Sequence, residues 1–184
     1  MKRRINPLLH LLGRIYSRLF GWTYVNELPN LPKFIMISGP HTSYWDAVHA
    51  VGIIWTLKLK PTIFIKHTMF RFPFGWFFRW IGGVPINRTS PRGTVAQVAD
   101  EFERRESWIL LIAPEGRRNK GEYIPWKTGF YRIAAEANVP IVPVRADFKH
   151  KQIVIGEPLM PTGAIEEEMA ELRAFIDAGY GVHH

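Results

Sequence analysis

Two residues behind an apolar segment, His41 and Asp46, have the types and spacing of a catalytic pair. Residues 34–37 are apolar and precede Ser-Gly-Pro, which predicts a buried strand followed by a turn. Residues five apart on one helix point about 140° apart, so His41 must lie in the turn to approach Asp46 on the next helix. A carboxylate that fixes the histidine tautomer leaves the other ring nitrogen as a general base. Such a pair can deprotonate a substrate hydroxyl.

Other interpretations of the same segment stay open. Many His–Asp pairs only cap or bridge elements, and His41, Asp46 and His49 could instead bind a metal ion for a hydrolase. We expect no metal, because the sequence offers no further His, Asp or Glu cluster to complete a ligand shell. Ser43 lacks the Gly-x-Ser-x-Gly surroundings of a nucleophilic serine. The chain has no cysteine, which excludes thiol nucleophiles, disulfides and Cys-zinc sites.

Three later segments are further candidates for parts of a site, and each of them follows or forms an apolar run. Residues 82–88 (GGVPINR) and 113–118 (APEGRR) are turns that carry arginine, the residue suited to bidentate phosphate recognition. The alternative for each is an ordinary surface arginine after a strand. Residues 139–144 (VPIVPV) contain two prolines, which predicts an edge or bulged strand that forms a wall.

The length of 184 residues and the alternation of elements predict a single α/β domain. Its sheet is expected to be mixed, mostly parallel and flanked by helices. The expected strands are residues 34–37, 62–66, 84–86, 108–112, 141–144 and 152–155. The expected helices are residues 44–57, 93–106, 129–138 and 165–178.

Charge is concentrated in the first half of the chain. Residues 1–92 carry 13 Lys or Arg and two acids, whereas residues 93–184 carry 11 Lys or Arg and 14 acids. This asymmetry indicates an anionic partner surface, either nucleic acid or membrane. No apolar run reaches the ~20 residues of a membrane span. If the partner is a membrane, the protein can therefore at most lie on it without crossing it.

The N-terminal residues 1–22 predict a basic amphipathic helix that starts after Pro7 and lies in a membrane interface. Leucines and isoleucines recur at helical spacing, while Arg14 and Arg18 lie on another face. The alternative is a terminal helix packed on its own core. Residues 64–80 interleave aromatic and basic side chains, which suits a headgroup boundary, a nucleic-acid surface or a core helix. Residues 23–184 form the remaining domain.

In order, these segments resemble the glycerolipid (lysophosphatidic acid) acyltransferase family. His41 and Asp46 match its His-x4-Asp motif, and residues 83–88 resemble its Gly-rich block ending in arginine. Pro114, Glu115 and Gly116 match its Pro-Glu-Gly block, and residues 139–144 resemble its Val-Pro-Ile-x-Pro-Val block. Residues 116–119 read Gly-Arg-Arg-Asn where the family usually has Gly-Thr-Arg-Ser.

The resemblance implies a glycerol-3-phosphate acyltransferase-like fold and transfer of an acyl group from acyl-CoA or acyl-carrier protein to a lysolipid hydroxyl. The most favoured acceptor is 1-acyl-glycerol 3-phosphate. His41 would be the general base and Asp46 would orient it, with no covalent intermediate and no cofactor. Arg88 would bind the acceptor phosphate.

Glu115, Gly116 and Arg117 would shape the acceptor site. The resemblance further implies a peripheral protein on the cytoplasmic face that binds anionic lipids and no nucleic acid. A lipid- or nucleic-acid-binding module without catalysis is the alternative, with the metal-dependent hydrolase behind it.

Overall fold

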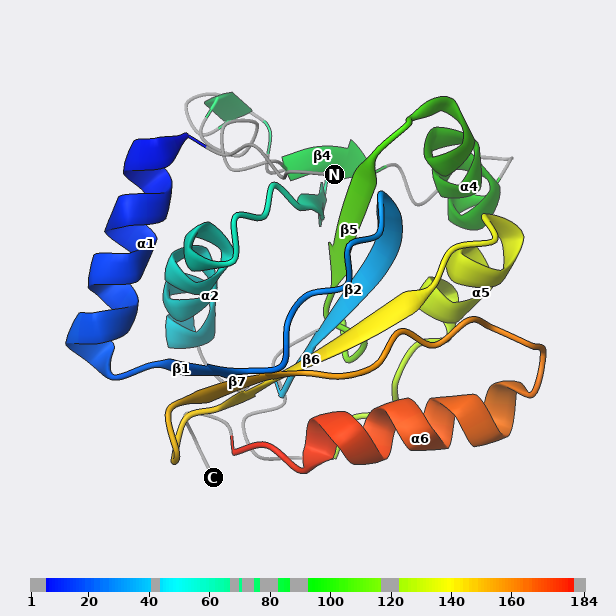
Figure 1. The fold of residues 1–184 in the computed structure, drawn as a ribbon. Coiled ribbons are helices and arrows are strands. Elements are labelled where there is room, and N and C mark those ends of the chain that lie inside the picture. The colour runs from blue at the N-terminus through cyan, green and yellow to red at the C-terminus, as the bar shows by residue number, and fades with distance from the viewer. Residues whose placement is uncertain are drawn as a thin grey trace.

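A central sheet organises the protein, as the computed structural model shows (Figure 1). It describes residues 6–40, 44–66, 70, 75–76, 83–86, 93–116 and 123–180, with the backbone alone at residues 44, 46–47, 63–66, 83 and 85–86. Within these residues the sheet has the order β1-β7-β6-β2-β5-β3-β4. Its strands are β1 Thr23–Val25, β2 Lys33–Gly39, β3 Thr62–Lys66, β4 Gly83–Ile86, β5 Trp108–Ile112, β6 Ile141–Asp147 and β7 Gln152–Ile155. Only β6 and β7 pair antiparallel among them, which confirms a mixed, mostly parallel sheet.

Helices cover both faces of this sheet. They are α1 Pro7–Phe20, α2 Tyr44–Thr56, α4 Thr94–Arg104, α5 Gly129–Glu136 and α6 Ile165–Asp177. In Figure 1, α1 and α2 lie to one side of the strands and α4, α5 and α6 to the other. This arrangement confirms the expected α/β domain, and the helix and strand ranges agree with the sequence periodicity to within a few residues. The short strand β1 was not expected.

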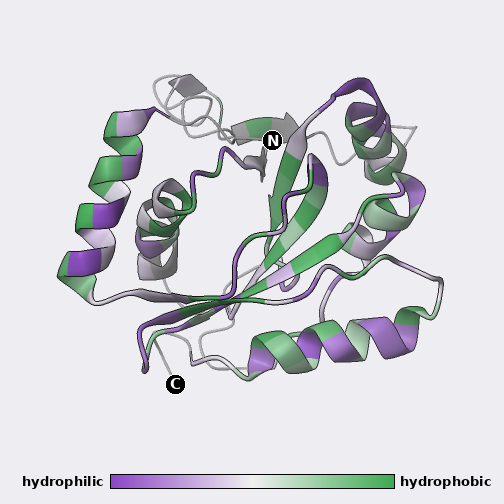
Figure 2. Cartoon of the chain, viewed as in Figure 1, coloured by the Kyte–Doolittle hydropathy of each residue, from purple (hydrophilic) through white to green (hydrophobic). Residues whose placement is uncertain are grey.

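Strand β2 lies at the centre of both hydrophobic cores. Phe34 and Met36 pack on the side of α1 and α2, whereas Ile35 and Ile37 pack on the side of α4, α5 and α6. Figure 2 shows the apolar colour on the central strands and mixed colours on the helices. A strand buried on both faces loses the alternation of polar and apolar residues, so β2 reads as one apolar run. The apolar run ends at Ile37, and the strand ends two residues later at Gly39.

The proline-rich strand β6 is not an edge strand, so the edge alternative of that prediction was wrong. The bulge alternative agrees with the pairing, which shifts by one residue between the pairs Val144–Ile155 and Ile141–Leu159. It lies between β7 and β2 in the sheet. The carbonyl of Pro143 accepts a hydrogen bond from the Gly156 N–H at 2.8 Å, one residue beyond the end of β7. A residue's nitrogen and carbonyl point to the same side of a strand. The Pro143 nitrogen, which carries no hydrogen, therefore faces the β7 side, where the pairing of β6 with β7 ends. The ladder between β6 and β2 is therefore left intact.

Helix α1 is bounded by clear caps. The Asn6 side chain accepts a hydrogen bond from the Leu8 N–H at 2.9 Å, and Pro7 occupies the first turn. Gly21 ends the helix in the left-handed conformation, with φ of 72°. These features confirm the N-terminal helix.

The face by which α1 packs on α2 is small and polar. A Cβ at Gly13 would lie 2.5 Å from the Thr56 nitrogen, so only glycine fits this crossing. The buried Ser17 hydroxyl bonds the hydroxyls of Thr56 at 2.9 Å and Tyr24 at 2.6 Å. The opposite face is exposed and apolar, and its members are Leu8, Leu11, Leu12, Ile15 and Leu19. The apolar stripe is thus turned away from the protein's own core.

No helix among the described residues combines the length and the apolar character that a bilayer crossing requires.

Candidate active site

The predicted site segments leave the sheet along one edge. Strands β2, β5, β3 and β4 are parallel, and Ile37 near the end of β2 pairs with Ile112 at the end of β5. His41 follows β2, Arg88 follows β4 and Glu115 follows β5 in the chain. We call this the carboxyl edge of the sheet. Ligands of open parallel α/β sheets bind along such an edge.

The described residues include only part of the predicted set. Gly116 and Glu115 are described in full, and Asp46 lies on the first turn of α2, although only its backbone is described. His41, Arg88 and Arg117 lie outside the described residues, so their roles remain predictions. Most of the aromatic segment 64–80 also lies outside them.

The turn after β5 is tightly fixed. The Gly116 N–H donates to the Ala113 carbonyl at 3.0 Å, and the Lys127 N–H donates to the Pro114 carbonyl at 3.0 Å. Gly116 has φ of 68°, and a Cβ there would lie 3.3 Å from the Lys127 side chain. The left-handed backbone conformation therefore favours glycine, whereas the flexible Lys127 side chain would have to move only slightly for a Cβ. The Glu115 side chain is buried, with 4% of its surface exposed. A buried carboxyl in the turn after β5 fits a functional site better than a solvated loop, because a buried charge needs polar partners.

An apolar cavity of about 130 Å³ reaches this edge from beneath α2. One end is formed by residues next to the strand ends, Pro40, Ala113 and Phe148. Deeper walls come from β2, β6, β7 and α2, with further lining residues Met36, Ala50, Ile53, Ile54, Leu57, Leu59, Val144 and Ile153. Pro40 directly precedes His41 in the chain. The cavity lining thus includes the residue that precedes the predicted base in the chain.

His49 lines the cavity between α1 and β6. Its Nδ1 and the Tyr16 hydroxyl form a hydrogen bond, and its ring lies 5.6 Å from Trp22 and 5.3 Å from Phe148 in edge-on contacts. Burial raises the pKa of the Tyr16 phenol above its usual value. His49 is therefore part of the packing between helices. Among the described residues no three His, Asp or Glu side chains form a metal site, while His41 and the Asp46 side chain lie outside that search.

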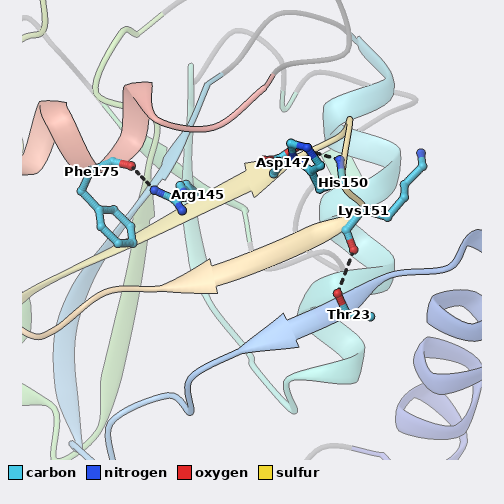
Figure 3. A network of polar contacts seen from close by, with 6 residues as sticks. All are labelled: Thr23, Arg145, Asp147, His150, Lys151 and Phe175. Atoms are coloured by element: carbon cyan, nitrogen blue, oxygen red, sulfur yellow. Dashed lines mark hydrogen bonds and ion pairs between the residues drawn. The ribbon is translucent and has the colours of Figure 1, made fainter.

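Sequence reasoning missed several residues at the carboxyl edge. Every second residue at the end of β6 lines the cavity, namely Val144, Ala146 and Phe148. Their spacing of two in the sequence could have indicated that they share one face of the strand. Arg145 pairs in register with Gly39 but points to the other face, where its guanidinium lies 5.2 Å from the Phe175 ring (Figure 3). Its Nη1 donates to the Phe175 carbonyl at 3.4 Å. Arg145 therefore contacts α6 and does not line the cavity.

Comparison with known proteins gives a consistent picture. The family model described as Acyltransferase matches residues 23–147. The 1-acyl-sn-glycerol-3-phosphate acyltransferase of Escherichia coli (strain K12) is 34% identical over 145 residues, covering 73% of this chain and 56% of that relative. The enzyme of the same name from Haemophilus influenzae is 26% identical over 183 residues, covering 89% of this chain and 74% of that relative. The chain thus spans little more than half the length of the first.

A solved structure shares the fold. The crystal structure of the 1-acyl-sn-glycerophosphate acyltransferase from Thermotoga maritima matches with a TM-score of 0.63 at 18% identity. The match covers 93% of this chain and 76% of that one. At this identity the likeness establishes the architecture alone.

Proposed function

Since this chain belongs to the acyltransferase family, we propose that it transfers a fatty acyl group to the hydroxyl of a lysophospholipid-like acceptor. The donor is acyl-CoA or acyl-carrier protein. The names of the relatives favour 1-acyl-glycerol 3-phosphate as acceptor. The observation that carries the proposal is the apolar cavity that ends at Pro40, Ala113 and Phe148. An acyl chain needs an apolar space near the reacting groups, and an apolar cavity at the carboxyl edge supports this proposal.

The chemistry we propose uses His41 as the general base. Asp46 orients the imidazole, and the free ring nitrogen takes the proton of the acceptor hydroxyl as its oxygen attacks the thioester carbonyl. The tetrahedral intermediate then expels the thiolate, which receives that proton from the imidazolium and leaves as a thiol. A backbone N–H at the carboxyl edge stabilises the oxyanion. This sequence needs neither a covalent enzyme intermediate nor a cofactor.

The acceptor is held by the turns after β4 and β5. Arg88 binds the acceptor phosphate, because a guanidinium matches phosphate geometry with two parallel hydrogen bonds. Glu115, Gly116 and Arg117 shape the surrounding site. The fixed turn at Gly116 and the buried Glu115 support this assignment.

Helix α1 holds the protein on the membrane in this proposal, at the cytoplasmic face. The support is its outward apolar stripe, in which Leu19 is 78% exposed. Arg14 and Arg18 are also exposed on the flank of the stripe. An exposed apolar face flanked by cations is the pattern of a helix that lies in the interface of an anionic membrane.

A thiol-release assay tests the proposal. The full chain is mixed with a panel of acyl-CoAs and acyl-carrier-protein thioesters and a panel of lysolipids, and free thiol and diacyl product are measured together. We expect thiol release that requires both a donor and a phosphate-bearing lysolipid. Vesicle binding without thiol release from any donor would instead support the non-catalytic lipid-binding module.

A further inference from the structure

The turn between β6 and β7 carries cations at the carboxyl edge. Residues 149–151, here called the basic turn, read Lys-His-Lys and follow Phe148, which lines the cavity. Lys149 is exposed and Lys151 is half-buried. The turn lies in the second half of the chain, where acids outnumber bases, so the sequence did not single it out.

The two lysines are not used in ion pairs among the described residues. Asp147 is the acid next to the turn, and it pairs with His150 at 2.8 Å (Figure 3). The Lys149 ammonium lies 4.7 Å from the Tyr180 ring centre, and the Lys151 ammonium lies 5.3 Å from that of Trp22. Rings that hold a cation without neutralising it leave its charge available to an anion. The basic turn therefore presents two cations that have no acidic partner in the described part of the chain.

The basic turn is continuous with the exposed end of α1. The Thr23 N–H, three residues beyond α1, donates to the Lys151 carbonyl at 2.8 Å. Figure 3 shows strand β1, which begins at Thr23, beside strand β7, which follows Lys151. Leu19 and Phe20, at the end of α1, expose 78% and 49% of their surfaces. Lysines beside Trp and Tyr rings and exposed apolar side chains are typical of a membrane headgroup layer.

We propose that the basic turn is a second membrane contact, which binds the phosphates of anionic lipid headgroups. This proposal rests on the proposed function, which supplies the membrane as the binding partner. It adds how the protein is oriented on that membrane. With the end of α1 and the basic turn both on the headgroups, the carboxyl edge at which they lie is held next to the bilayer. A lysolipid acceptor then reaches the site from the membrane surface without crossing open water.

The test compares Lys149→Gln/Lys151→Gln with the matched control Lys58→Gln/Lys60→Gln. The control removes the same charge from exposed lysines at the opposite edge of the sheet, between α2 and β3. Partitioning is measured with vesicles of phosphatidylcholine alone and of phosphatidylcholine mixed with phosphatidylglycerol. Each lysine near an anionic surface contributes about fivefold to partitioning, so we expect the basic-turn variant to bind the mixed vesicles about 25-fold more weakly. Binding of the control should equal that of the wild type.

Three further outcomes decide the matter. Lys149→Arg/Lys151→Arg keeps the charge and should keep the binding, which separates electrostatics from misfolding. Equal weakening in the basic-turn variant and the control would overturn the proposal, because the contact would not be local. Unchanged vesicle binding with a raised KM for acyl-CoA would also overturn it and assign the turn to donor phosphates. Because vesicle binding needs no turnover, absent thiol release in the wild type would contradict the proposed function separately.

Discussion

The Tyr16 hydroxyl on α1 is hydrogen-bonded to Nδ1 of His49 on α2, and His49 in turn lines the apolar cavity. The helix proposed to lie in the membrane is thereby joined to the wall of the proposed acyl site. Gly13 and Ser17 complete this interface with close backbone approach and buried hydroxyl contacts. The position of α1 and the shape of the cavity therefore depend on each other.

Loss of the Tyr16 hydroxyl should destabilise the fold. Tyr16→Phe removes the hydrogen bond between the phenol and the half-buried His49 imidazole, which we expect to lower the free energy of unfolding by about 0.5–1.5 kcal/mol. The measurement is chemical denaturation followed by far-UV circular dichroism. Tyr123→Phe is the control, because that hydroxyl is exposed and bonds only Arg173 among the described residues. A Tyr16→Phe protein as stable as the control would show that the contact contributes nothing.

The exposed stripe of α1 should matter for membrane binding and not for folding. In Leu11→Ser/Ile15→Ser we expect an unfolding free energy within about 0.5 kcal/mol per site of the wild type, because neither side chain is buried. Partitioning into anionic vesicles, measured by sedimentation, should fall more than about tenfold, because burial of such a side chain contributes about 1.5–3 kcal/mol. Strong destabilisation with unchanged partitioning would show instead that the stripe packs on the protein.

Filling the cavity should change the choice of acyl chain. Ala50 lines the cavity from α2, so Ala50→Leu removes space that an acyl chain would occupy. We expect the preferred acyl-CoA to become shorter, with long donors losing about fourfold in kcat/KM for each displaced methylene. The exposed Ala174 on α6 provides the control Ala174→Leu. An unchanged chain-length profile in Ala50→Leu would place the acyl chain elsewhere.

The buried Glu168 should make stability fall in acid. The Thr162 hydroxyl donates to it at 2.6 Å and the Tyr131 hydroxyl at 2.6 Å, and these bonds lower its pKa from the ordinary 4.5. A lowered native pKa means that its contribution is complete above about pH 4.5 and is lost as pH falls through the native pKa. Glu168→Gln should cost about 1.5–3 kcal/mol at pH 7 and less in acid.

The check is the unfolding free energy of both proteins from neutral to acid pH. The exposed Glu167→Gln on the same helix is the control and should leave stability nearly unchanged. If the unfolding free energies of Glu168→Gln and the wild type differed by the same amount at every pH, the ionised Glu168 carboxylate would not be the stabilising group.

The sequence was sufficient for the fold class and for the strands that precede the predicted site segments. Buried strands of a parallel sheet appear as apolar runs, so β2 and β5 and the turns behind them could be located. The position of β6 could not be derived, because the effect of Pro143 depends on which neighbouring strand its missing N–H faces. Strand β1 escaped notice because three residues carry too little periodicity.

Amphipathicity alone does not say which face of α1 packs. The apolar stripe was visible in the sequence, but the packed face is defined by Gly13 and Ser17, whose small size matters only against α2. The cavity was equally hidden, since its lining comes from several strands and helices far apart in the chain. Such features arise from tertiary packing and not from local propensity.

The central claim is that His41, oriented by Asp46, is the general base of acyl transfer. The direct test is thiol release from acyl-CoA in the presence of 1-acyl-glycerol 3-phosphate, measured for wild type, His41→Ala, Asp46→Asn and the control His10→Ala at the far end of α1. We predict that His41→Ala lowers kcat by about 10²–10⁴-fold or more while its unfolding free energy and vesicle binding stay near those of the wild type. Asp46→Asn should also lower kcat, and His10→Ala should not. Full activity of folded His41→Ala would contradict the account.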